Sequence, residues 1–429
     1  LELAYSLFRT DKIQLWLDEL QLQPNQADTI REHETFFSSG ARIDSLKEII
    51  SSEDDTLSLK YKMLLVMTNS QQDMEGVIAT LFAELASEEE SSLRLIKRCN
   101  LDQFLWDQLK RLYNYEADTP TIADFAIELF KASFQIACNI PAKLNPESQL
   151  LFRRWKNDRN NNNSFTTLAS SYQEDLGIKE ELASLDLKSI LDVDYFEEIE
   201  CFFVRSLLKV IHNQTIPRKD VKQIIHKRRN SHFFKKFENI YNTLFFASEL
   251  FHDMSDMSFG MDSFDDGLKR YCKTWFKIDQ HYRNFIYNYQ QSSEPTLLND
   301  IYQLVENKYV NDFLRKVNDV WQNKVDLITS WKSDALISQN NFYDHFVGEF
   351  RRKEIKTVVI ISDAMRYEIG DELLSMVRER DRFDAELQPM LASVPCYTQL
   401  GMASLLPNKK LKILDPNSAT ISIDGKSTS

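Results

Sequence analysis

The sequence has 429 residues, 43% hydrophobic and 12% aromatic, so it has enough apolar side chains for packed cores and is not a disordered chain. At roughly 100 to 200 residues per domain, this length predicts two to four domains. The net charge is −13, and its distribution along the chain is more informative than the total.

The charge is distributed unevenly. Residues 1–150 hold 14 Lys and Arg against 25 Asp and Glu, a net charge of −11, whereas residues 151–354 hold 29 against 30 and residues 355–429 hold 9 against 10. Phosphate backbones would repel the acidic first part. It suits a basic protein surface, or it serves solubility alone.

The five cysteines are widely spaced and include no Cys-x-x-Cys pair. This pattern predicts reduced thiols rather than a disulfide framework or a structural zinc site. No run of about 18 apolar residues occurs, and the first residues lack a basic segment followed by an apolar one. We therefore expect a cytoplasmic protein that does not contact membranes.

Amphipathic helices are predicted through the first part of the chain. Apolar residues recur at helical spacing in residues 57–65, 77–85 and 93–112, with polar breaks at 51–55 and 87–90. Thr119 and Pro120 predict the start of a further helix, because threonine can cap a helix and proline is tolerated at its first position. The expected buried stripe of that helix is Ile122, Phe125, Leu129, Phe130 and Phe134.

Composition also predicts domain boundaries. Pro141, Pro146 and the four asparagines at 160–163 mark a boundary between two helical subdomains. Six glycines and six prolines precede residue 355, against three and four in the last 75 residues. The expected division is an acidic helical subdomain at 1–150, a second helical subdomain with a basic stretch at 151–354, and an α/β module at 355–429.

Basic residues gather between positions 218 and 236, where only Asp220 opposes them. They are Arg218, Lys219, Lys222, Lys227, Arg228, Arg229, Lys235 and Lys236. Because Phe233 and Phe234 stand beside them, this basic stretch is a candidate nucleic-acid-binding surface. The alternative is a solvated helix face, or a face that docks on the acidic first part of the chain.

The apolar run at 358–361, followed by Ser362 and Asp363, predicts a buried parallel strand that ends in a carboxylate. The apolar segment at 383–392 predicts a neighbouring strand, and residues 365–380 have the pattern of the connecting helix. The expected apolar face of that helix is Ile369, Leu373, Leu374 and Val377. Asp363 would lie at the carboxyl edge of the sheet, where α/β folds keep their sites, or would cap the helix instead.

Thr398 stands at the predicted start of the helix after the second strand. Adjacent strands lie roughly 4.8 Å apart, so Thr398 and Asp363 are predicted above one edge of the sheet, within reach of one metal ion. A carboxylate beside a hydroxyl can hold a metal ion and activate a nucleophile. The alternative for Thr398 is an ordinary threonine of a helix amino terminus.

Two other phosphate-related motifs fit poorly. A phosphoaspartyl hydrolase of the haloacid type needs a second aspartate two residues after Asp363, where Met365 stands. The segment at 425–427 ends like a P-loop, but Thr420 occupies the position of the required glycine.

Two segments carry a resemblance to a known family. Residues 358–366 (VVIISDAMR), followed by Tyr367, Glu368 and Glu372, and above all residues 393–407 (SVPCYTQLGMASLLP), resemble the start of the PglZ domain of the alkaline phosphatase superfamily. The long helical front resembles, in its layout, the PglZ type A proteins of bacterial BREX phage-defence systems. The expected fold is therefore a mainly α-helical front followed by the start of an α/β alkaline-phosphatase-like domain with parallel strands.

The resemblance implies specific chemistry. Asp363 corresponds to the first metal-ligating aspartate, and Thr398 to the nucleophilic threonine, itself a metal ligand. The reaction implied is metal-dependent hydrolysis of a phosphomonoester or phosphodiester through a phosphothreonine, with zinc as the usual metal of the superfamily. Nucleic acid is a candidate substrate in phage defence, and other BREX proteins are the expected partners.

The superfamily site needs further aspartates and histidines from later in the domain, and no histidine follows His345. We therefore expect a truncated piece of a longer hydrolase, which is inactive alone and binds metal weakly or not at all. The alternative is a non-catalytic helical scaffold that docks other defence components and carries a vestigial phosphatase module.

Overall fold

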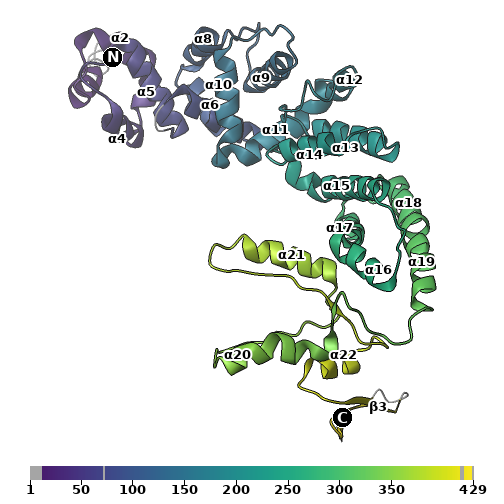
Figure 1. The fold of residues 1–429 in the computed structure, drawn as a ribbon. Coiled ribbons are helices and arrows are strands. Elements are labelled where there is room, and N and C mark those ends of the chain that lie inside the picture. Colours follow the sequence, from purple (N-terminus) through teal and green to yellow (C-terminus); the bar gives the residue numbers. More distant parts are fainter. Residues whose placement is uncertain (1–11, 71–72, 416–419, 428–429) are drawn as a thin grey trace. The chain divides into compact units, whose positions relative to one another are not determined.

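The structure is a computed structural model that describes residues 12–70, 73–415 and 420–427 (Figure 1). Packing divides the chain into two compact units, Leu1–Phe203 with Asn230–Phe234, and Val204–Arg229 with Lys235–Ser429. The division into 1–150, 151–354 and 355–429 stays a prediction.

Unit 1 is built of helices. They are α2 (Ala27–Glu32), α3 (Glu34–Phe37), α4 (Gly40–Ile49), α5 (Thr56–Thr68), α6 (Met74–Ala86), α7 (Ser91–Arg98), α8 (Asp102–Tyr113), α9 (Ile122–Ala137), α10 (Glu147–Asn157), α11 (Asn162–Asp175) and α12 (Ile178–Leu182), with the 3-10 turns η1 (Pro24–Gln26) and η2 (Arg159–Asn161). Helix α13 (Glu197–His212) contributes residues to both units.

Side-chain caps set the starts of several helices. The carboxylates of Asp55 and Asp73 accept the third backbone N–H of α5 and α6. Thr121 caps α9, because its extended backbone lets its hydroxyl accept a hydrogen bond from Asp124 N. The predicted start at Thr119 is therefore two residues early. The predicted helix at 93–112 is two helices, because Asn100 adopts a φ of +58° between α7 and α8.

The predicted stripe of α9 is confirmed, since all five of its residues are buried. Phe130 lies at the centre of an aromatic cluster, with ring centroids 5.2 Å from Phe152, 5.3 Å from Phe165 and 5.4 Å from Phe196. Aromatic pairs at such spacing stabilise a core beyond the area they bury. The core of unit 1 is therefore aromatic where α9, α10 and α11 meet.

Unit 2 continues with helices and ends in small sheets (Figure 1). Its helices are α14 (Arg218–Arg228), α15 (Phe234–Asp256), α16 (Phe264–Arg270), the π-helix η3 (Tyr271–Trp275), α17 (Phe276–Gln291), α18 (Asn299–Asn307), the π-helix η4 (Lys308–Leu314), α19 (Arg315–Val325), the 3-10 turn η5 (Gln339–Asn341), the π-helix η6 (Tyr343–Val347), α20 (Gly348–Arg352), α21 (Tyr367–Arg378) and α22 (Thr398–Leu405).

Two small sheets are present in the described residues. Strand β1 (Ile337–Ser338) pairs in parallel with β2 (Met390–Leu391). Strands β3 (Leu411–Asp415), β4 (Thr420–Ile423) and β5 (Lys426–Ser427) pair antiparallel. Asp424 and Gly425, with φ of +49° and +89°, turn the chain between β4 and β5, as this dipeptide favours. The segment that ends like a P-loop is thus a hairpin.

The fold class is confirmed, but one predicted strand is wrong. Residues 356–362 form no strand, and Val358 and Ile360 are 75% and 88% exposed. A parallel strand needs a hydrogen-bonded neighbour and cover on both faces. The described residues give this run no partner strand, because β2, the only part of the predicted second strand that forms, pairs with β1 instead.

None of the helices in the described ranges combines the length and the apolar character that crossing a membrane requires. The five cysteines are all free thiols, as their spacing predicts.

Candidate functional site

Asp363 and Thr398 lie beside each other, although they are 35 residues apart in the sequence. The Thr398 hydroxyl donates a hydrogen bond to Asp363 Oδ2 over 3.4 Å. Both side chains are exposed and line one hollow, together with Ser362, Arg366 and Cys396. The structure therefore brings together the two residues that the sequence analysis singled out, and their roles stay a proposal.

A strained loop presents Asp363. Ala364 adopts a φ of +54°, a region that favours glycine, and its N–H donates to Asp363 Oδ1 at 3.0 Å. The N-cap of α21 is Arg366, so Asp363 does not cap that helix and the predicted start at residue 365 is two residues early. The alternative interpretation of Asp363 as a helix cap is wrong.

Thr398 is the first residue of α22. This helix is held in place because Leu400 and Ala403 pack with Ile421 of β4 in a small core. A threonine at this position has its hydroxyl beside the free backbone N–H groups of the helix start, where anions are stabilised.

Gln339 positions the loop before α22, and nothing in the sequence pattern indicates this role. Its side-chain carbonyl accepts from Ser393 N at 3.1 Å, and its Nε2 donates to Gly401 O at 3.3 Å. Arg366 also lines the hollow, and the sequence analysis gave it no role. An arginine at a helix N-cap, where short polar side chains are preferred, is the signal that could have marked it.

The residues present supply only part of a metal site. Asp363 and Thr398 offer two oxygen ligands, whereas a catalytic zinc is held by three protein ligands. Among the described residues, no group of three or more His, Cys, Asp and Glu side chains is placed to hold a metal ion. The two oxygens fit a corner of a divalent-cation site, and the described chain does not complete it.

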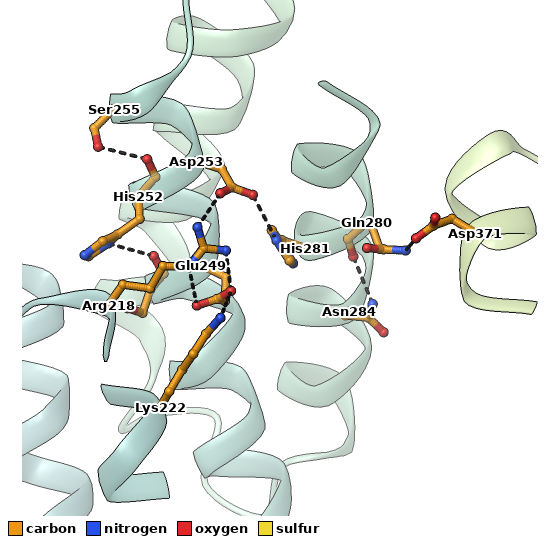
Figure 2. A network of polar contacts seen from close by, with 11 residues as sticks. Arg218, Lys222, Glu249, His252, Asp253, Ser255, Gln280, His281, Asn284 and Asp371 are labelled. Carbon is orange, nitrogen blue, oxygen red and sulfur yellow. Dashed lines mark hydrogen bonds and ion pairs between the residues drawn. The ribbon is translucent and has the colours of Figure 1, made fainter. Parts of the chain in front are cut away.

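The basic stretch is partly neutralised (Figure 2). Arg218 pairs with Glu249 and with Asp253 at 2.8 Å, and Lys222 pairs with Glu249 at 3.0 Å. Arg228 is buried with 1% exposure. The exposed charge of α14 is therefore smaller than the sequence suggests.

Three further residues of the basic stretch are exposed, namely Lys219, Arg229 and Lys235, and Lys235 pairs with Glu238 at 3.0 Å. Lys227 and Lys236 are exposed as well and take part in further interactions. Phe233 and Phe234 are buried, so these rings cannot stack on bases. Binding of nucleic acid by this stretch stays a prediction that would rest on charge alone.

Comparison with known proteins supports the assignment of the last part of the chain. Residues 342–429 match the family model of the BREX system PglZ alkaline phosphatase-like domain. The last part of the chain is thus similar to the PglZ family. We call residues 342–429 the PglZ domain for this similarity; it includes η6 and α20 as well as Asp363 and Thr398.

Two curated relatives resemble the chain beyond the PglZ domain. The alkaline phosphatase-like protein BrxZ of Escherichia coli O9:H4 (strain HS) is 26% identical over 100% of this chain and 54% of its own length. The alkaline phosphatase-like protein PglZ of Bacillus cereus (strain H3081.97) is 26% identical over 94% of this chain and 49% of its own length. The chain spans about half the length of these relatives. No solved structure shows a significant match.

Proposed function

We propose that this chain is part of a metal-dependent phosphoester hydrolase of a bacterial BREX phage-defence system. The observation that supports this proposal is the contact of 3.4 Å between Thr398 Oγ1 and Asp363 Oδ2 inside a PglZ domain. The two relatives, both described as alkaline phosphatase-like, support the same proposal. The expected location is the bacterial cytoplasm, and the expected partners are other BREX proteins.

In this proposal Thr398 is the nucleophile and Asp363 is a ligand of a divalent cation, with zinc as the expected ion. Such an ion lowers the pKa of a neighbouring hydroxyl and neutralises phosphate charge. Thr398 is exposed at a helix start, so a phosphoryl group can approach both its oxygen and the free N–H groups of α22. Asp363 accepts the Thr398 hydrogen bond, which orients the hydroxyl toward the hollow.

The test is hydrolysis of p-nitrophenyl phosphate and bis-p-nitrophenyl phosphate by the complete protein with Zn²⁺, Mn²⁺ or Mg²⁺. Thr398→Ala should abolish hydrolysis, whereas Thr398→Ser keeps a hydroxyl and should retain part of it. Asp363→Asn should weaken Zn²⁺ binding in calorimetry. Cys396→Ser is the matched control, because Cys396 lines the same hollow and has no proposed role.

The stability of Thr398→Ala must be measured alongside its activity. Loss of a threonine N-cap typically costs about 1 kcal/mol, and Thr398 is not the N-cap of α22, so the variant should keep its fold. Full hydrolytic activity in a folded Thr398→Ala protein would refute the assignment of the nucleophile.

A scaffold role remains the second proposal, and the acidic first part of the chain favours it. The net charge of −11 in residues 1–150 suits a basic surface on another protein. If wild-type protein hydrolyses neither ester with any of the three metals, yet co-purifies with other BREX proteins, the scaffold replaces the hydrolase.

A further inference from the structure

Arg366 lines the same hollow as Asp363 and Thr398. Among the described residues that line this hollow, it is the only basic one. Its side chain is 60% exposed, so the guanidinium is open to a ligand. A phosphoryl group brought next to the Asp363 carboxylate needs positive charge nearby, and Arg366 is the side chain in position to provide it.

A buried carboxylate lies beside Arg366 and forms an ion pair with it. Arg366 Nε lies 2.9 Å from Glu368 Oε1, and Glu368 has no exposed surface. A carboxylate so buried is stable as an ion only beside a cation. The guanidinium has five N–H donors, so contact through Nε leaves the donors of its terminal nitrogens for two oxygens of another anion. In the described part of the chain, Arg366 makes no second ion pair.

Residues of helix α17 also contact Glu368, which lies on α21. Arg283 of α17 lies 4.0 Å from Glu368 Oε1 and pairs with Glu372 at 2.6 Å. Gln280, also on α17, donates to the backbone oxygen of Glu368 at 3.0 Å, and Figure 2 shows its side chain turned toward Asp371 of α21. The position of Glu368 is thus set by the packing of α17 on α21.

Local preferences do not explain an arginine at position 366. As N-cap of α21 it makes no side-chain capping bond within the described structure, where Asn, Asp, Ser or Thr would be favoured. Its positive charge also opposes the helix dipole at this end. Two residues earlier, Ala364 is strained. An unfavourable N-cap residue and a strained backbone only two residues apart are characteristic of functional loops.

We propose that Arg366 binds the phosphoryl group of the substrate in the hollow formed by Asp363 and Thr398, and that Glu368 positions the Arg366 guanidinium. This inference rests on the proposed hydrolase function and adds the residue that recognises the anion. Arg366 contacts the substrate, whereas Glu368 acts through Arg366.

The experiment titrates inorganic phosphate into the complete protein, with and without Zn²⁺, by calorimetry. The wild type should bind phosphate, and Arg366→Gln should weaken binding about tenfold or more because a charged two-donor contact is lost. Arg366→Lys should bind phosphate with intermediate affinity, since lysine keeps the positive charge but lacks the paired N–H donors of a guanidinium. Glu368→Gln should weaken binding although Arg366 is intact. Arg382→Gln, an exposed arginine outside the hollow, is the control and should bind as the wild type does.

A second readout separates recognition from a merely structural role. If Arg366 only neutralises Glu368, then Arg366→Gln lowers the melting temperature and leaves phosphate affinity unchanged, which overturns the inference. The double variant Arg366→Gln with Glu368→Gln also removes the buried charge of Glu368, which Arg283 approaches only to 4.0 Å; it should recover the melting temperature without recovering phosphate binding. A wild type that does not bind phosphate in the presence of Zn²⁺ also overturns the inference.

Thr398→Ala distinguishes this inference from the proposed function. That variant should lose ester hydrolysis and retain phosphate binding. If it stays active while Arg366→Gln loses phosphate binding, the nucleophile assignment fails and the anion site stands.

Discussion

Arg218 of α14 donates a hydrogen bond from Nε to the carboxylate of Glu249 of α15 at 2.9 Å (Figure 2). This contact links the two helices, and the Glu249 side chain is only 5% exposed. Because Lys222 approaches the same carboxylate and Arg218 also pairs with Asp253, two carboxylates balance two cations of the basic stretch. The stretch therefore contributes to the stability of unit 2.

Glu249→Gln should destabilise the protein by about 2 kcal/mol, because hydrogen bonds to a charged group are lost at a buried position. Denaturant unfolding measures the change. Glu238→Gln is the matched control: it breaks the exposed pair with Lys235 and should cost less than about 1 kcal/mol. Equal losses in the two variants would show that the Glu249 contacts are no stronger than a surface pair.

Stability should also depend on the ionisation of Glu249. Burial alone would raise its pKa, but hydrogen bonds from Arg218 and Lys222 outweigh burial and hold the pKa below its ordinary value of 4.5. A depressed pKa in the folded state gives stability that is present above the unfolded value and is lost as the pH falls through the folded value. Below about pH 4.5, the unfolding free energy of the wild type should therefore fall more steeply than that of Glu249→Gln. Parallel pH curves would contradict this.

Ala364→Gly should stabilise the loop that carries Asp363. A left-handed backbone costs an alanine roughly 1–2 kcal/mol, whereas the extra chain entropy of glycine costs about 0.5–1 kcal/mol. The expected gain is up to about 1.5 kcal/mol in unfolding free energy. Ala335→Gly, at a position outside the left-handed region, should instead lose stability. A loss in both variants would mean that Ala364 is not strained.

Gly267→Ala and Gly40→Ala should have opposite effects on stability. A Cβ on Gly267 would lie 2.7 Å from Met261 Sδ and 3.1 Å from the ring of Trp321, so overpacking of about 1–3 kcal/mol outweighs the gain in helix propensity. A Cβ on Gly40, the first residue of α4, meets no atom within 4 Å and should add up to about 1 kcal/mol. Thermal unfolding of the two variants checks the sign of each.

Local patterns predicted those parts of the fold that local chemistry determines. The stripe of α9 from Ile122 to Phe134 is buried as expected, because helical spacing alone defines one apolar face. The run at 358–361 shows the limit of this reasoning: an apolar segment becomes a strand only where a neighbour pairs with it, and the described residues supply none.

The candidate site could be predicted only in part, because some of its contacts depend on tertiary packing. Asp363 and Thr398 carry residue types that point to chemistry, and the structure places them in contact. Gln339 reaches this region from 54 residues before Ser393, and its role depends on tertiary packing that no local pattern indicates. Arg218 and Lys222 looked like free charge because their partners lie about 30 residues away on another helix.

Helix α17 uses adjacent residues for contacts on two sides. His281 lies 3.1 Å from Asp253 of α15, and Gln280 lies beside Asp371 of α21 (Figure 2). Gln280 also donates to the backbone oxygen of Glu368. Since neighbouring residues on a helix point about 100° apart, any rotation of α17 about its axis disturbs both contacts at once. A change in the packing of α17 on α15 would therefore also disturb its contacts with α21, the helix that carries Glu368, at a distance from the hollow itself.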